Sequence, residues 1–431
     1  MPGGLYSSVE TSNVMRILAL SAQLPYPFHH GKAMRDFALL TGLAAQHEVK
    51  LLAFGTEDEV EAARPLAARV PFRALPRPAH TLPRRFWFLL SGQPDLVGRT
   101  WSRSFVGLLR ETIFQERPDL LLVEGLEMAP YGLLVARALR SSTLLSWVLD
   151  EHNAEYVLQQ RAWEIARGEH GQGAQALYSR LQAARLARFE RRACLAAHTV
   201  VAVSDVDRQA LLRIAPAAQV AVVPNGVDTA YYAPLPGAGS QDQPTLVFTG
   251  RMDFRPNVDA VVWFCRDIWP RIRARCGRAR FWIVGRNPTQ PVRALGALPG
   301  VEVIGAVPDD RAWIGAADVY VLPMRFGGGV RFKLLQALSM ARATVSTRLG
   351  AEGVEGLVDG EHLALADTPE SFAEQVLRLL DDADARARLG RSGRELMVSR
   401  YDWRVLLPRF EEAIVQAARW PRKKERACGS H

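Results

Sequence analysis

Cysteine is scarce in this sequence, and long apolar runs are absent. Only four of its 431 residues are cysteines, Cys194, Cys265, Cys276 and Cys428, and neither paired spacing nor grouping with histidine connects them. This pattern predicts buried or incidental thiols in a reducing compartment rather than disulfides or a zinc site. No apolar run approaches the length of a membrane span. The polar stretch 1–13 has no apolar signal core, so we expect a cytoplasmic protein.

Two common nucleotide-binding motifs are also missing. The first predicted strand leads into Gly31 and Lys32, which are reminiscent of a phosphate-binding turn. The full phosphate-loop spacing G-x-x-x-x-G-K followed by Ser or Thr is absent there, and so is the dinucleotide pattern G-x-G-x-x-G. An ATPase or a nicotinamide dehydrogenase is therefore poorly supported.

The charge that is present is mainly positive. The formal net charge is +9, which favours an anionic partner. The content of 48% hydrophobic and 23% charged residues is typical of a soluble globular protein. Nucleotide, nucleic acid and acidic membrane all fit that charge. We expect no nucleic acid, because the sequence shows neither aromatic stacking platforms nor a recognised nucleic-acid module.

Apolar, β-rich runs alternate with amphipathic helical patterns along the chain. Strands that are apolar throughout, with helices between them, predict parallel sheets covered on both faces. Residues 231–245, rich in Pro, Gly, Ser and Gln, form the best linker, so we expect two doubly wound α/β domains facing a cleft. The expected strands lie at 14–20, 48–54, 119–125, 143–150, 198–204, 219–226, 244–250, 279–286, 301–307, 318–323, 343–348 and 362–366.

The most informative motif is the glycine-rich turn in "RFGGGVRFKLLQALSM", residues 325–340. It leads from a buried strand into a helix, whose unpaired N–H groups and dipole favour an anion such as phosphate. Glycines 327–329 let a ligand approach the backbone, and Arg331 and Lys333 add cations in the first turns. The alternative is an ordinary strand–helix turn with solvated basic residues.

A second cation follows the first predicted strand of the second half. Gly250 permits a tight exit from that strand and places Arg251 at the predicted cleft, where its guanidinium suits a phosphate. Arg255 in the same loop is a further candidate, Asn257 is expected to be the N-cap of the next helix, and Gly285 follows the neighbouring strand. The alternative for Arg251 is an ordinary surface ion pair.

Polar residues cluster where a first-half strand ends, at Asp150, Glu151, His152 and Asn153. Ligands of doubly wound sheets bind beyond the carboxyl ends of the strands. His152 is therefore expected to face the cleft opposite the phosphate loops and to hydrogen-bond a substrate hydroxyl or a reacting oxygen. The alternative is that Asp150 or Asn153 caps the following helix while His152 is solvated.

These pieces together resemble a glycosyltransferase of the GT-B fold, in the retaining family 4 group. The resemblance covers nearly the whole chain and rests on the order and spacing of "LPYPFHHGKAMR", "DEHNAEY", "VVPNGVD", "FTGRMDFRPNVDAVVWF", "GAVPD" and "FGGGVRFKLLQALSMARATVSTRLGAEGV". It implies sugar transfer from a nucleotide-diphosphate sugar to a glycan or lipid-linked acceptor, without metal or other cofactor. It implies a Rossmann-like acceptor domain at 1–232, a Rossmann-like nucleotide-sugar domain at 233–404, and a crossover helix with a basic tail at 405–431.

The resemblance also implies roles for individual residues. His152 would contact the transferred sugar, and Arg251 would grip the diphosphate together with Lys333. Gly31 would lie beneath the donor phosphates and the acceptor, and Val307 near the base. The other donor-binding candidates are Gly250, Arg255, Asn257, Gly285, Gly327, Gly328, Gly329, Val330, Arg331 and Gln336, and no metal ligand is expected.

Two positions depart from the family pattern. Asn257 stands where members usually carry a lysine, and we favour Lys333 as its replacement because it lies beside the glycine turn. Gln336 stands in place of the glutamate that binds the ribose hydroxyls, and Gly328 in place of the motif's first glutamate. A glutamine carbonyl still accepts one hydroxyl, but the loss of the charge-assisted bond costs roughly 1–2 kcal/mol.

The acceptor side is marked by two basic stretches, 84–110 and 178–196. They are suited to rest on the anionic inner face of a membrane and reach a lipid-linked acceptor; the alternative is packing on the sheet with the arginines in water. Two rival functions stay open. One is a nucleotide-sugar epimerase of the same fold, and the other is a weakened family member that acts as a binding protein.

Overall fold

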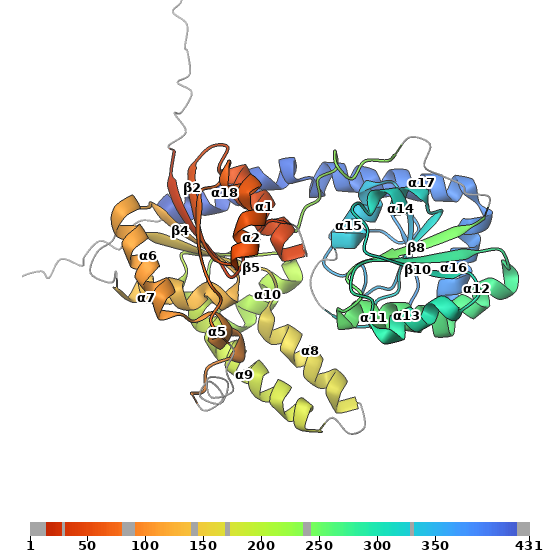
Figure 1. Cartoon of the computed structure of the whole chain (residues 1–431), viewed down its shortest axis with the longest axis horizontal. Helices are drawn as coiled ribbons and strands as arrows, with labels where there is room; N and C mark the ends of the chain where they lie inside the picture. Colours follow the sequence, from red (N-terminus) through yellow and green to blue (C-terminus); the bar gives the residue numbers. More distant parts are fainter. Residues whose placement is uncertain are drawn as a thin grey trace, which may run out of the picture.

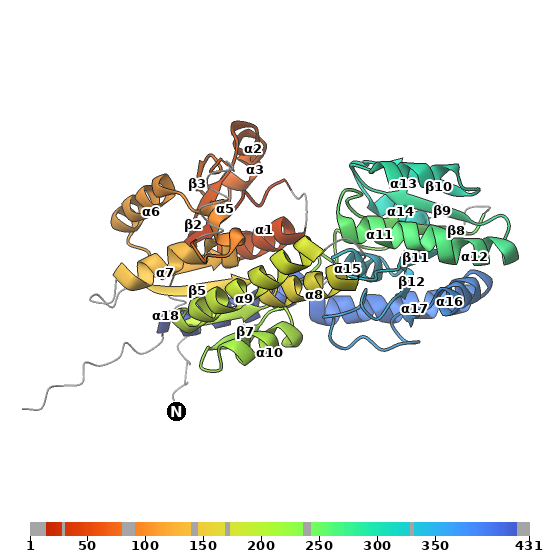
Figure 2. The same ribbon diagram turned by 90° about the horizontal axis from the view of Figure 1, so that it is seen from below.

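Two parallel sheets, each flanked by helices, lie side by side in the molecule (Figures 1 and 2). We call the part of the chain that forms the seven-stranded sheet the first half and the part that forms the six-stranded sheet the second half. The expected α/β class and GT-B architecture are thereby confirmed. The computed structural model describes residues 14–27, 31–79, 91–138, 145–168, 173–235, 243–327 and 332–419.

The first sheet has seven strands in the order β3-β2-β1-β4-β5-β6-β7, all parallel. Its central strand β4 is buried along its whole length, which explains why its sequence is apolar until the final glutamate. The strands are β1 Arg16–Ser21, β2 Glu48–Phe54, β3 Phe72–Leu75, β4 Leu120–Glu124, β5 Ser146–Glu151, β6 Thr199–Ala202 and β7 Val220–Val222.

The second sheet has six parallel strands in the order β10-β9-β8-β11-β12-β13. In both sheets the order reverses beside the first strand of the half, and such a switch point opens a crevice at the carboxyl ends of the strands. The strands are β8 Thr245–Thr249, β9 Arg280–Val284, β10 Val301–Gly305, β11 Val319–Leu322, β12 Ala343–Ser346 and β13 Ala364–Leu365.

Helices connect the strands and cover the sheets (Figure 2). In the first half they are α1 Gly31–Leu43, α2 Glu57–Ala62, α3 Arg64–Ala67, α5 Asp95–Thr100, α6 Arg103–Glu116, α7 Ala129–Ala138, α8 Glu155–Gly168, α9 Gly173–Ala196 and α10 Asp205–Ile214. In the second half they are α11 Arg255–Trp263, α12 Trp269–Arg275, α13 Gln290–Ala294, α14 Arg311–Ala316, α15 Phe332–Ser339, α16 Pro369–Asp381 and α17 Ala383–Leu396.

The last helix, α18 Trp403–Arg419, crosses back to the first half, as the family resemblance implied. The backbone crosses where Val227 and Asp402 form an isolated β-bridge. Beyond this point Phe410 and Ile414 of α18 are fully buried in one core cluster with Leu39 of α1. The C-terminal helix of the chain is thus part of the first-half core.

All twelve strands expected from the sequence are present, and one strand was missed. β3 has the sequence "FRAL", and its residues are half-buried or exposed rather than apolar throughout. It lies at the edge of the first sheet, where one side of a strand carries no partner strand. An apolar run was therefore the wrong signal for this element.

Candidate active site

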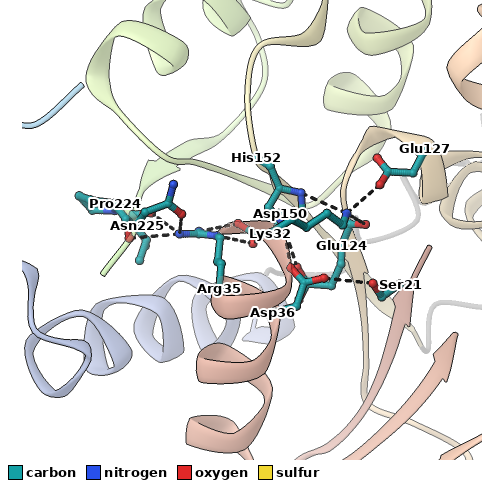
Figure 3. Close-up of polar contacts among 11 residues, drawn as sticks. Ser21, Lys32, Arg35, Asp36, Glu124, Glu127, Asp150, His152, Pro224 and Asn225 are labelled. Atoms are coloured by element: carbon teal, nitrogen blue, oxygen red, sulfur yellow. Dashed lines mark hydrogen bonds and ion pairs between the residues drawn. The ribbon is translucent and has the colours of Figure 1, made fainter. Parts of the chain in front are cut away.

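His152 lies at the end of β5 within a network of buried charged side chains from the first half (Figure 3). Its Nε2 is 3.1 Å from Asp36 Oδ1 and 3.6 Å from Glu124 Oε2. Asp36 comes from α1 and also accepts a 3.0 Å bond from Ser21 Oγ. The three strands β1, β4 and β5 thus deliver polar groups to one point at their carboxyl ends, as the doubly wound rule predicts.

Lys32, at the start of α1, occupies the other side of the His152 ring. Its Nζ is 3.3 Å from His152 Nδ1, donates to Glu127 Oε1 at 2.7 Å and donates to the carbonyl of Glu124 at 3.0 Å. Each ring nitrogen of His152 thus already has a partner, Asp36 at Nε2 and the Lys32 ammonium at Nδ1. Lys32 therefore serves the first-half network rather than a phosphate loop.

Arg35 and Asp150 form a bidentate ion pair behind the histidine. The two bonds, Nε to Oδ2 and Nη2 to Oδ1, measure 2.8 and 2.7 Å, and both side chains are fully buried. Arg35 also donates to the carbonyls of Val223 and Pro224. Asp150 therefore does not cap the following helix, which was one of the alternatives; it anchors α1 to the end of β5.

The pKa values of the side chains in this network are shifted in different directions. Burial and the Lys32 ammonium lower the pKa of His152, but Asp36 and the other carboxylates outweigh them and raise it to about 9. Burial, with Asp36 and Asp150 nearby, raises the pKa of Glu124 to about 8. The pKa of Glu127 is lowered, because Lys32 outweighs the effect of burial. These shifts favour a protonated His152 and a protonated Glu124, beside the ion pairs Lys32–Glu127 and Arg35–Asp150.

Asp36, Glu124 and His152 are the one group in the described part of the chain whose ligand atoms, all within 4.8 Å of one another, could hold a metal ion. Two of them are already bonded to each other, and Asp36 also binds Ser21. A metal ion at this point would have to displace the hydrogen bond between His152 Nε2 and Asp36 Oδ1.

Lys333 of the second half lies at the end of β8. Lys333 Nζ donates to Asn257 Oδ1 at 2.6 Å and lies 4.4 Å from the centre of the Phe248 ring. Asn257 Nδ2 donates to the carbonyl of Arg251 at 2.9 Å. A Cβ added at Gly250 would lie 2.7 Å from Lys333 Nζ, so only glycine leaves this space open. Lys333 thus stands beside the residue that replaces the family's usual lysine.

The prediction that Asn257 is an N-cap is wrong. Phe254 holds that position, and Asn257 lies inside the first turn of α11 with its side chain turned to Arg251 and Lys333. Arg251 itself makes a bidentate pair with Asp253 at 3.0 and 2.9 Å, and 44% of its side chain is exposed. Arg255 stacks over the Phe326 ring at 5.4 Å.

Two predicted glycines allow close approach of chain segments. A Cβ at Gly31 would lie 2.4 Å from the Phe332 ring, the first residue of α15, so the two halves meet here. A Cβ at Gly285 would lie 1.7 Å from the Gly250 carbonyl. Gly327 adopts a φ of 116°, and Val307 is half-buried against the second-half core. Gly328, Gly329, Val330 and Arg331 lie outside the described residues.

Gln336 is buried and faces across the halves. Its Nε2 donates to the hydroxyl of Tyr232 at 2.8 Å and lies 4.0 Å from Met34 Sδ. The amide thus uses a donor that the family's glutamate does not have. No local pattern pointed to this partner, because Tyr232 lies at the edge of the predicted linker.

Sequence reasoning missed most of the network around His152. Asp36 and Glu127 lie on or beside helices, and nothing local separates them from solvated charges. Glu124 did offer a signal, since a carboxylate at the end of a fully apolar strand is exceptional among buried residues.

Comparison with known families matches both halves. The family described as Glycosyltransferase Family 4 matches residues 37–231, and the family described as Glycosyl transferases group 1 matches residues 243–382. The two matches follow one another along the chain and lie in the first and second halves respectively.

Curated relatives align with part of the chain. A GDP-mannose-dependent alpha-(1-6)-phosphatidylinositol monomannoside mannosyltransferase of Mycobacterium tuberculosis is 28% identical over 227 residues, or 46% of this chain and 56% of the relative. An alpha-maltose-1-phosphate synthase of Mycolicibacterium smegmatis is 26% identical over 50% of this chain and 62% of its own length. The chain spans about half the length of the curated relatives it matches.

Solved structures share the fold along almost the whole chain. A sucrose-phosphate synthase from Thermosynechococcus elongatus has a TM-score of 0.68 at 16% identity, covering 93% of this chain and 98% of its own. Anabaena HepE, solved with UDP and glucose, has a TM-score of 0.64 at 14% identity, covering 93% and 100%.

Proposed function

The chain belongs to the group 1 and family 4 glycosyltransferases, and we propose on that basis that it transfers a sugar, with retention, from a nucleotide-diphosphate sugar to a glycan or lipid-linked acceptor. The second half, 233–404, would bind the donor and the first half, 1–232, the acceptor, with 405–431 completing the first half. One observation carries the proposal. Gly31, next to Lys32 of the His152 network, contacts Phe332. Phe332 is in turn next to Lys333, the lysine bonded to Asn257.

The chemistry follows from the charges on the two sides. Lys333, Arg251 and the start of α15 would neutralise the leaving diphosphate, and such preorganised groups are each worth roughly 3–4 kcal/mol in a transition state. His152 would contact a hydroxyl of the transferred sugar; to do so, one ring nitrogen would exchange its present partner, Asp36 or Lys32, for that hydroxyl. The leaving phosphate would take the acceptor proton on the same face, so no second carboxylate is needed.

We further propose that the enzyme works in the cytoplasm against the inner face of a membrane. No helix among the described residues is long and apolar enough to cross a bilayer. The outer face of α9, however, carries the exposed arginines Arg180, Arg188, Arg191 and Arg192 beside the exposed side chains of Leu177, Leu181 and Leu195. Such a face suits an anionic lipid surface.

The direct test is binding and turnover with a panel of nucleotide sugars that begins with GDP-mannose and UDP-glucose. Each donor is offered alone, with a lipid extract and with oligosaccharides, and the stereochemistry of the product is determined. We expect one donor to raise the melting temperature and to be consumed only when an acceptor is present. Epimerised donor without acceptor would favour the epimerase, binding without turnover would favour the binding protein, and neither effect with any donor would overturn the proposal.

A further inference from the structure

Arg161 joins the two halves at a point outside the site described above. It lies on α8 of the first half, and its guanidinium makes two parallel bonds of 2.8 Å to the carboxylate of Glu352 in the second half. Nη1 is also 3.5 Å from the carbonyl of Gly327, which opens the glycine turn. A single side chain of the first half thus contacts two second-half segments that follow β11 and β12.

Both ends of this bridge are held in place. On the first-half side, Glu190 accepts the backbone N–H groups of Glu155 and Tyr156 at 2.9 and 3.1 Å, which fixes the start of α8. On the second-half side, Thr347 Oγ1 donates to the carbonyl of Met324 at 2.6 Å, which ties the segment before Glu352 to the end of β11. A bidentate pair between preorganised groups loses little conformational entropy on forming.

The bridge also closes a hollow between the halves. α8 and α10 form its first-half wall, and the segment around Glu352 forms the opposite side; the lining includes Val157, Leu158, Asp207, Ala210 and Gly353. About a third of the Arg161 side chain and 29% of the Glu352 side chain are exposed. Separation of the halves must break the pair.

From this geometry we propose that Arg161 is a positioning residue: with Glu352 it forms a cross-half latch that holds Gly327 against the first half and keeps water from the donor. The effect on catalysis rests on the proposed function, whereas the effect on the arrangement of the halves does not. The latch can therefore be tested by two independent measurements, the shape of the protein in solution and the ratio of donor hydrolysis to transfer.

The test is a charge-reversal cycle on the full chain: Arg161→Glu, Glu352→Arg and the double exchange. Each single change is expected to increase the radius of gyration measured by X-ray scattering. It is also expected to raise the donor KM about tenfold, which is a usual size for coupling between sites. The ratio of donor hydrolysis to transfer should rise as well. The double exchange is expected to restore all three. Arg208→Glu, which breaks an exposed bridge to Asp205 within the first half, is the matched control.

The outcomes separate the two claims. If the single variants keep the wild-type radius, donor KM and hydrolysis ratio, or if the double exchange restores none of them, the latch is wrong. If the wild type turns over no donor while the radius still follows the charge pattern, the latch stands and the proposed function fails. Arg161→Lys, which keeps the charge but not the two parallel bonds, is expected to fall between the wild type and Arg161→Glu.

Discussion

At the scale of single residues, Lys333 and Asn257 form a hydrogen bond at the position where the family usually carries a lysine. The family's usual lysine position holds Asn257, whose carbonyl oxygen accepts from Lys333 at 2.6 Å. The ammonium is thus placed beside the end of β8 from a helix 76 residues further along. At position 257 alone the sequence departs from the family, whereas the fold places a lysine from another segment beside it.

Lys333→Met is therefore expected to weaken binding of the nucleoside diphosphate. A charge-assisted bond to phosphate contributes roughly 1.5–3 kcal/mol, which corresponds to a loss of about 10- to 150-fold in affinity by calorimetry. Lys50→Met, at a surface lysine paired with Glu116, is the control and should bind like the wild type. Unchanged affinity in Lys333→Met would refute the assignment.

The protonation of His152 is a second property decided by single neighbours. Asp36→Asn removes the carboxylate 3.1 Å from Nε2, so the pKa of His152 is expected to fall from about 9 by one unit or more, each unit being about 1.4 kcal/mol. Lys32→Met removes the opposing ammonium and should raise that pKa. Histidine chemical shifts followed by NMR against pH measure both; equal pKa values in the two variants would contradict the network.

His152 also makes the free energy of unfolding depend on pH. Its folded pKa, about 9, exceeds the ordinary value of 6.5, so the folded state binds more protons between these values. The stabilising contribution of His152 is complete below pH 6.5 and disappears as the pH rises through 9. In Asp36→Asn this part of the decline in unfolding free energy should shrink, which denaturant titrations at pH 6.5 and 9 would show.

Single residues also mark the limit of prediction from sequence. His152, Arg251 and Lys333 were singled out because each follows a strand or a glycine turn. Asp36 and Glu127 were not, since their charged partners His152 and Lys32 lie 116 and 95 residues away and local sequence carries no record of such pairings. The N-cap expected at Asn257 failed for the same reason: a tertiary contact takes the amide that capping would use.

At the scale of elements, apolar runs predicted most strands. The edge strand β3 was missed because its residues are half-buried or exposed and need not be apolar.

The start of α8 is held by a residue that is distant in the sequence. Its first two N–H groups are satisfied by Glu190 of α9, not by a local cap. Glu190→Ala is expected to leave both unpaired and cost roughly 2–4 kcal/mol.

Urea unfolding compares this variant with Arg188→Ala, which lies on the outer face of the same helix. Only Glu190→Ala should lower the midpoint, and hydrogen exchange should rise first in α8. Equal midpoints in the two variants would mean that α8 starts without its distant cap.

The outer face of α9 is a second property of an element as a whole. Its only acid, Glu190, is buried, whereas its exposed arginines lie among exposed leucines. Reversing Arg188, Arg191 and Arg192 to Glu should weaken sedimentation with vesicles of anionic lipid by roughly a hundredfold, at about 1 kcal/mol for each arginine. The exposed second-half arginines Arg275, Arg278 and Arg293 provide the control triple. Equal loss in both triples would indicate a nonspecific effect of net charge.

At the scale of the whole molecule, α18 makes the first half depend on the end of the chain. Phe410 is fully buried in the core that also holds Leu39 and Leu122 of the first half, so Phe410→Ala is expected to cost roughly 3–5 kcal/mol. The loss should fall on one half: hydrogen exchange should rise in β1 and β4 while β9 and β11 keep their protection. Phe372→Ala, equally buried in the second-half core, should show the reverse pattern. If both variants loosened both sheets alike, the halves would share one cooperative unit, and the crossing helix would bind them energetically as well as covalently.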